Sequence, residues 1–235
     1  MVPPRVGLYT AIYGGYNTPK QIPESLACHA VLFTDSEQTA EMAQAAGWCP
    51  RLMTSPYDDL GHDAAAYGDP GIVVPMLRHK WFKTHPLDAM SGYDVSIWID
   101  GSMQVTRDDF VDLCLTALGD DDWAMMTHPS RDCIYPEADY SATLTWRYDA
   151  ASINAQSAHY RAFHPAGTGL IATGFNVRRH TDIVEHLGRQ WWYDITRWSH
   201  QDQISLPVLL HLIGNDLRWN TNLPWHQWLT HWPHG

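Results

Sequence analysis

Short apolar runs, rich in β-branched and aromatic residues, alternate along this chain with longer stretches of helical character. Runs of this length that end at Gly, Asp or Thr are typical of buried strands. We expect strands over residues 5–12, 30–33, 51–54, 93–99, 123–127 and 169–177. We expect helices over residues 38–46, 69–84, 106–118, 136–163 (in one or two pieces), 182–193 and 202–212. This alternation predicts an α/β fold with one mixed, mostly parallel sheet that helices cover on both faces.

Capping residues define the start of two of these helices. Asp69 is followed by a proline, the typical order of an N-cap and a first helical turn. Thr106 is the expected N-cap of the next helix. Residues 56–68 are polar and predict a loop, and the Trp-, His- and Pro-rich tail from Trp219 has no clear periodicity.

Length and composition favour a single folded domain. The chain has 235 residues, of which 45% are hydrophobic and 17% charged. It contains no internal repeat and no low-complexity linker, so we expect one domain over residues 1–235. No apolar run is long enough to span a membrane, and the N-terminus lacks the apolar core of a signal peptide. We therefore expect a cytoplasmic protein.

Charge and cysteine usage exclude some functions. The formal net charge of −11 disfavours a broad surface for duplex DNA, although a local basic pocket is compatible with it. The four cysteines are widely spaced and form no Cys-x-x-Cys pair, which disfavours a zinc site or a disulfide framework. The 12 tryptophans are compatible with carbohydrate binding, but most of them are expected in the core.

The segment Ser-Ile-Trp-Ile-Asp-Gly-Ser, residues 96–102, is the most informative motif. It reads as a buried strand that ends at Asp100, at the sheet edge where ligands bind in α/β proteins. Gly101 allows a sharp turn and a close approach of the backbone to a ligand. A carboxylate at Asp100 and a hydroxyl at Ser102 suit Mn²⁺ or Mg²⁺ bound together with the phosphates of a nucleotide.

Three further clusters precede this motif. The loop after the first strand contains two glycines but matches no known phosphate-binding loop. Asp35 follows the second strand, where it accepts hydrogen bonds from a nucleotide or caps the next helix. Arg78 and Lys80 could neutralise a diphosphate, or lie on a solvated helix face with Lys83. On a regular helix Arg78 and Lys80 point in different directions, so they need not share one ligand.

Three clusters follow the motif. His128 and Arg131 lie in a polar loop after a strand, which either lines a pocket or is a hydrogen-bonded structural loop. Asp202, followed by Gln203, is either a general base, a group that positions the sugar, or a carboxylate at a helix N-terminus. One histidine of the tail, His226, His231 or His234, could complete a metal site.

The order of these motifs resembles one family. The segments are YTAIYGGY, LFTD, RHKWFKTHP, YDVSIWIDGSMQV, HPSRDCIY and DQISLPVLL, and they cover about residues 6–212. They are similar to the glycosyltransferase-like domains of formerly unknown function found in plants, bacteria and phages. The plant members are linked to the synthesis of mucilage and cell-wall polysaccharides.

The resemblance implies a GT-A glycosyltransferase fold, with a nucleotide-binding half over about residues 1–105 and an acceptor half over about 106–235. The residues implied to bind the nucleotide and its phosphates are Thr10, Ala11, Tyr13, Asp35, Arg78, Lys80, Asp100, Gly101 and Ser102. Those implied to bind the sugar or acceptor are His128, Arg131 and Gln203. The implied metal ligands are Asp100, Ser102 and His226, and the implied catalytic residues are Asp202 and Asp100. The motif here is Asp-x-Ser, so the second carboxylate of the usual Asp-x-Asp is missing.

These observations favour a transferase that moves a sugar from a nucleoside diphosphate to a hydroxyl acceptor. The resemblance implies that the donor nucleotide is uridine diphosphate. The acceptor is a glycan or, in a phage or bacterial setting, a modified base in DNA. Two alternatives are open: a carbohydrate-binding module without activity, and a nucleotidyltransferase. The sugar, the acceptor, the stereochemical course and the oligomeric state are not defined by the sequence.

Overall fold

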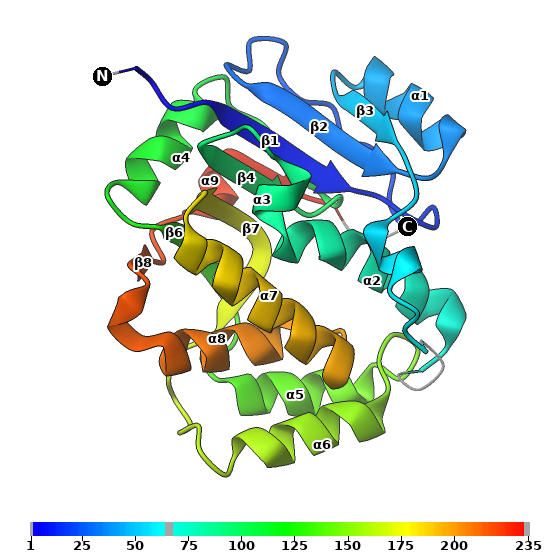
Figure 1. Ribbon diagram of the computed structural model, residues 1–235, viewed down its shortest axis with the longest axis vertical. Coiled ribbons are helices and arrows are strands. Elements are labelled where there is room, and N and C mark those ends of the chain that lie inside the picture. Colours follow the sequence, from blue (N-terminus) through cyan, green and yellow to red (C-terminus); the bar gives the residue numbers. More distant parts are fainter. Residues whose placement is uncertain (1, 64–67, 233–235) are drawn as a thin grey trace.

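A seven-stranded sheet forms the centre of the protein, for which a computed structural model describes residues 2–63 and 68–232. The strand order is β3-β2-β1-β4-β7-β6-β8 (Figure 1). The strands are β1 (Val6–Ala11), β2 (His29–Thr34), β3 (Cys49–Leu52), β4 (Val95–Ile99), β6 (Trp123–Thr127), β7 (Ile171–Arg179) and β8 (Trp219–Asn220). Two short strands, β5 (Met103–Val105) and β9 (Leu229–His231), pair apart from this sheet.

The sheet is mixed and mostly parallel, as predicted. β1 lies parallel to β2 and β4, β2 to β3, and β6 to β8. β7 is the exception, because it runs antiparallel to both of its neighbours, β4 and β6. Parallel strands place their carboxyl ends at one edge, so the loops after β1 and β4 lie next to each other.

Helices cover both faces of the sheet (Figure 1). They are α1 (Glu37–Ala45), α2 (Pro70–Thr84), α3 (Pro86–Ala89), α4 (Phe110–Leu118), α5 (Ile134–Thr143), α6 (Ala150–Tyr160), α7 (Asp182–Arg197), α8 (Asp202–Ile213) and α9 (Trp225–Trp228). Two 3₁₀ turns are η1 (Pro56–Asp59) and η3 (Gly214–Asp216). The predicted helical stretch over 136–163 is thus two helices, α5 and α6.

Alternation along the strands divides the core between the two faces. Leu8 and Ile97 belong to one apolar cluster, which includes residues of α1 and α4. Tyr9 and Trp98, the next residue on each strand, belong to another, which includes Phe82 of α2. Both strands are fully buried, which explains their continuous apolar sequence.

Two expectations about local structure were wrong. Thr106 does not cap the helix that follows, because its hydroxyl donates to the carbonyl of Trp228 at 3.0 Å and the helix begins at Phe110 after Asp109. The tail does contain regular structure, since β9 pairs antiparallel with β5 and sets Met103 opposite His231. Both features depend on contacts between residues more than a hundred positions apart, which local patterns do not encode.

None of the described helices is long and apolar enough to cross a lipid bilayer.

Candidate functional site

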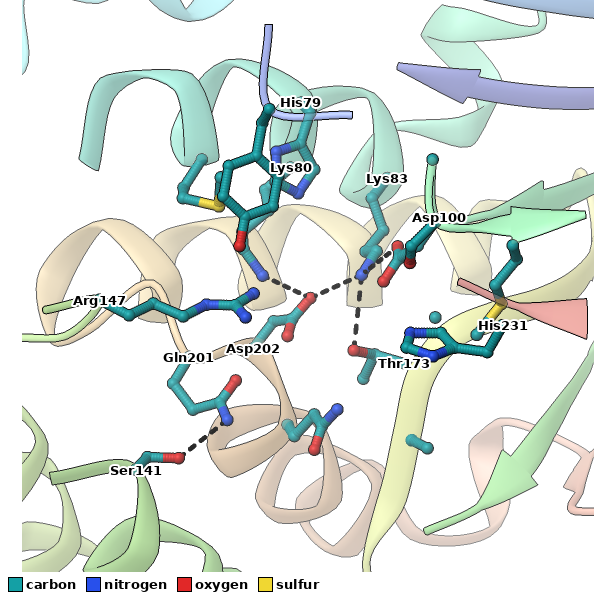
Figure 2. Close-up of a pocket in the computed structure, with 18 of the residues that line it drawn as sticks. His79, Lys80, Lys83, Asp100, Ser141, Arg147, Thr173, Gln201, Asp202 and His231 are labelled. Carbon is teal, nitrogen blue, oxygen red and sulfur yellow. Dashed lines mark hydrogen bonds and ion pairs between the residues drawn. The ribbon is translucent and has the colours of Figure 1, made fainter. Parts of the chain in front are cut away.

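A cavity of about 540 Å³ opens at the carboxyl ends of β1 and β4. Helix α2, the N-terminus of α8, strand β7 and the connection between α5 and α6 complete its wall (Figure 2). It is lined by charged, polar and aromatic side chains from both halves of the chain. A concave site of this size and mixed polarity is where a small-molecule substrate is expected.

Asp100 lies at the end of β4 and faces this cavity, as predicted. Its Oδ1 accepts hydrogen bonds from Trp98 Nε1 at 2.8 Å and from Lys83 Nζ at 2.9 Å. About a third of the side chain is exposed (35%), so the carboxylate remains accessible from the cavity. Burial alone would raise the pKa of Asp100, but Lys83 holds that pKa below its usual range.

Glycines allow the backbone to pack tightly around Asp100. A Cβ on Gly174 would lie 2.6 Å from the side chain of Met103 and 3.1 Å from Asp100 Oδ2. A Cβ on Gly101 would lie 3.0 Å from Ile12, although Gly101 does not adopt a positive φ. The chain turns sharply here, as expected, since the N–H of Met103 donates to the carbonyl of Asp100 at 2.8 Å, and the close packing against Ile12 favours glycine at this turn. Ser102 is buried beside it and lines the cavity.

Lys80, Lys83 and Asp202 form a buried charge cluster on the floor of the cavity (Figure 2). Asp202 Oδ2 accepts from Lys80 Nζ at 2.8 Å and from Lys83 Nζ at 2.9 Å. The two lysines are three residues apart on α2 and so share one helix face, while Asp202 is the first residue of α8. Asp202 is a carboxylate at a helix N-terminus, as one reading of the sequence predicted, and it also lines the cavity.

The cluster changes the protonation behaviour of its members. Burial raises the pKa of Asp202, but the two lysines outweigh it and hold that pKa far below the usual range. Burial lowers the pKa of Lys80 to about 8. Burial also lowers the pKa of Lys83, but Asp100 and Asp202 outweigh it and raise that pKa above its usual value. A carboxylate whose pKa is lowered in this way is a weaker general base, which favours the positioning role of Asp202 over a role as base.

Three residues expected at the nucleotide, Thr10, Asp35 and Arg78, do not line the cavity. Arg78 lies on another face of α2 and bonds Asp58 at 2.8 Å and Asp35 at 3.2 Å. Neither Arg78 nor Asp35 lines the cavity. Helix geometry separates Arg78 from Lys80, as the sequence suggested. Thr10 is buried within β1, whereas Ala11 and Tyr13, as expected, line the cavity.

The residues predicted to bind the sugar or acceptor reach the cavity from two elements, the loop after β6 and helix α8. His128, Arg131 and Gln203 all line the cavity. His128 Nδ1 accepts from the backbone N–H of Arg131 at 3.0 Å, and burial lowers the pKa of this histidine. Arg131 forms an ion pair with Glu137, which also accepts from Gln201 Nε2 at 2.8 Å. The loop therefore both supports its own structure and contributes to the site.

Sequence reasoning assigned no role to two residues of the site. Glu137 lies two residues after the HPSRDCIY segment, and Arg147 lies in the connection between α5 and α6. Of the tail histidines, His231 lines the cavity, whereas His226 is exposed on α9 and does not. His231 arrives there through the pairing of β9 with β5, directly after the Asp100 turn. His234, another histidine of the tail, lies outside the described residues.

Residues 67–226 match the family profile of the TOD1/MUCI70 glycosyltransferase-like domain. The chain belongs to this family.

The fold also resembles core-mannan synthase A (CmsA/Ktr4) from Aspergillus fumigatus in its Mn/GDP form, with a TM-score of 0.52 and 10% identity over 89% of this chain and 70% of that one. It resembles the mannosyltransferase Ktr4p from S. cerevisiae in complex with GDP, with a TM-score of 0.51 and 10% identity over 94% of this chain and 70% of that one. No curated protein matches the sequence significantly. The family member described here therefore has the predicted GT-A fold.

Proposed function

We propose that this family member is a glycosyltransferase that moves a sugar from a nucleoside diphosphate to a hydroxyl group of an acceptor. One observation carries the proposal: Asp100 ends β4 inside a cavity whose floor is the Lys80, Lys83 and Asp202 cluster. A carboxylate and two buried lysines together suit a ligand that carries both phosphates and hydroxyl groups. The family membership and the fold support the same reaction class.

The donor set fits a divalent cation that is bound jointly with a substrate. The described residues contain no cluster of three or more His, Cys, Asp or Glu side chains able to form a complete metal site. Mg²⁺ in such enzymes is commonly held by only one or two carboxylates and by substrate phosphates. Asp100 and His231 offer an oxygen and an imidazole on the same side of the cavity (Figure 2), and both suit Mn²⁺. When bound there, the cation would offset the negative charge of the departing diphosphate.

The chain's own residues account for the rest of the binding. Lys83 is fixed between Asp100 and Asp202, and Lys80 is fixed by Asp202, so both ammonium groups are positioned before a substrate arrives. Such preorganised charges stabilise a leaving group without further rearrangement. Asp202, which stays ionised, orients hydroxyl groups of the donor sugar by accepting their hydrogen bonds. Because Asp202 does not take up a proton near neutral pH, the acceptor hydroxyl loses its proton to another group.

The outer part of the cavity suits a glycan acceptor. Trp146 and Tyr140 line it and are 59% and 49% exposed, which is unusual for large aromatic side chains without a partner surface. Both rings supply apolar area, and Ser141 and Gln201 add polar groups to the same lining. A sugar ring presents the same combination of apolar faces and hydroxyl edges. The net charge of −11 favours a glycan over DNA.

A donor screen tests the proposal. The protein is incubated with Mn²⁺ and each of several UDP- and GDP-sugars, and released nucleoside diphosphate is measured. At least one donor is expected to be consumed, and Asp100→Ala is expected to reduce release to background. Asp94→Ala is the matched control, because Asp94 lies beside the other end of β4 and bonds Arg5 outside the cavity. Release of pyrophosphate in place of nucleoside diphosphate would instead indicate nucleotidyl transfer, and equal activity of Asp100→Ala would refute the proposal.

A further inference from the structure

The charges that line the cavity are paired, with one exception. Three of its cations have carboxylate partners: Lys80 bonds Asp202, Lys83 bonds Asp202 and Asp100, and Arg131 bonds Glu137. Arg147 is the remaining basic side chain of the lining, histidines aside. Among residues 2–63 and 68–232, no carboxylate forms an ion pair with Arg147.

The surroundings of Arg147 hold its guanidinium at the cavity and leave it without a hydrogen-bonded partner at Nε. The guanidinium carbon lies 5.8 Å from the ring centre of Tyr16 and 5.3 Å from that of Tyr148. The Nε atom is buried and has no hydrogen-bond acceptor among the described residues. Figure 2 shows the side chain extending into the cavity towards Asp202 and Gln201.

An unpaired, partly buried guanidinium is costly, because charge removed from water needs a compensating partner. Cation–π contacts with the two rings and the charges of Asp202 and Asp100, which raise the pKa of Arg147 against the effect of burial, recover part of this cost, but neither carboxylate forms an ion pair with the guanidinium. The planar group also offers several N–H donors in a fixed arrangement that matches a phosphate or a carboxylate. The missing partner of Arg147 is therefore expected on the ligand.

We propose that Arg147 binds an anionic group, a phosphate or a carboxylate, of one of the two substrates. This inference rests on the proposed function, because it assigns a ligand group to the same cavity. Two sources supply that chemistry: the diphosphate of the donor, and an acidic group on the acceptor. Trp146, which precedes Arg147 in the chain, and Tyr140 line the same cavity, so an acidic sugar of the acceptor would meet a cation and aromatic surface in one site.

The test compares Arg147→Met with Arg161→Met. Methionine keeps an apolar chain between the two tyrosines and removes only the charged head. Arg161 is the matched control, because its guanidinium carbon lies 4.0 Å from the ring centre of Tyr135 but outside the cavity lining. In the donor arm, calorimetry measures Kd for GDP and UDP with Mn²⁺. In the acceptor arm, thermal shifts are measured with glucuronate and glucose 6-phosphate against glucose, at matched ionic strength.

Loss of about tenfold or more in GDP or UDP affinity in Arg147→Met alone assigns the arginine to the donor. Unchanged nucleotide affinity, with loss of the extra stabilisation that an acidic sugar gives the unmodified protein, assigns it to the acceptor. The proposal is overturned if Arg147→Met behaves as Arg161→Met in both arms, or if no anionic probe binds the unmodified protein better than its neutral counterpart. Turnover of donors by the unmodified protein is scored separately, so failure of the proposed function is distinguishable.

Discussion

Asp202→Asn is the change that most directly tests the buried charge cluster. Asp202, Lys80 and Lys83 are 3%, 5% and 1% exposed, so the interactions among them are little screened by solvent. Removing one partner of a buried ion pair costs about 3–5 kcal/mol, because the other charge stays buried without compensation. Lys83 keeps Asp100 at 2.9 Å, so the loss falls mainly on Lys80.

The expected size of the effect follows from the protonation of Lys80. Burial already lowers the pKa of Lys80 to about 8, and loss of the carboxylate lowers that pKa further. The lysine then becomes neutral near pH 7, which relieves part of the penalty. We expect the free energy of unfolding to fall by roughly 3 kcal/mol, equivalent to a Tm lower by roughly 6–12 °C for a domain of this size.

The assay is urea unfolding of four proteins: the unmodified chain, Asp202→Asn, Lys80→Met, and the double variant. In the double variant neither charge is left buried without its partner. Its loss in the free energy of unfolding is therefore expected to be about 1–3 kcal/mol smaller than the sum of the losses in the two single variants. Additive losses, or a loss below about 1 kcal/mol in Asp202→Asn, would refute the assignment of Lys80 and Asp202 as a coupled buried pair.

Three further predictions concern pH, metal and packing. Lys80 loses its charge as the pH rises through about 8, so kcat/KM for the donor should fall above that pH. Arginine stays charged there, so Lys80→Arg should move this fall to higher pH in a pH–rate profile. A profile that does not move would exclude Lys80 as the source of the fall. His231→Ala should weaken apparent Mn²⁺ affinity in turnover assays by about tenfold while His226→Ala leaves it unchanged, and equal effects would contradict the site at β9. Gly188→Ala should lower the free energy of unfolding, measured by denaturant titration, by about 1–3 kcal/mol, because the new Cβ would lie 2.1 Å from the carbonyl oxygen of Thr84. An unchanged free energy of unfolding would show that α2 and α7 can separate without cost.

The positions of the main elements could be predicted from local patterns. β4 is a continuous apolar run because both faces of the central strand are covered, and its end at Asp100 is visible in the sequence. The start of α2 at Pro70 follows from the capping carboxylate of Asp69, which accepts from the backbone N–H of Gly71 at 2.8 Å. These features are set by neighbours in the chain, so a single sequence contains the information.

The composition of the site depended on tertiary contacts that local patterns do not contain. Apolar residues such as Val73, Leu77 and Phe82 are buried on several sides of α2, so the pattern does not show whether Arg78 or Lys80 faces the cavity. His231 reaches the site through strand pairing with a segment more than a hundred residues earlier. The role of such residues becomes visible only when the two halves of the chain are placed together.

Titration of GDP and UDP into the protein by calorimetry, with and without Mn²⁺, tests the central claim most directly. The account predicts that at least one nucleotide binds, that Mn²⁺ strengthens the binding, and that Asp100→Ala weakens it by at least about tenfold while the variant remains cooperatively folded. Absence of nucleotide binding to the unmodified protein, or equal affinity in the folded Asp100→Ala variant, would contradict the assignment of this cavity as the donor site.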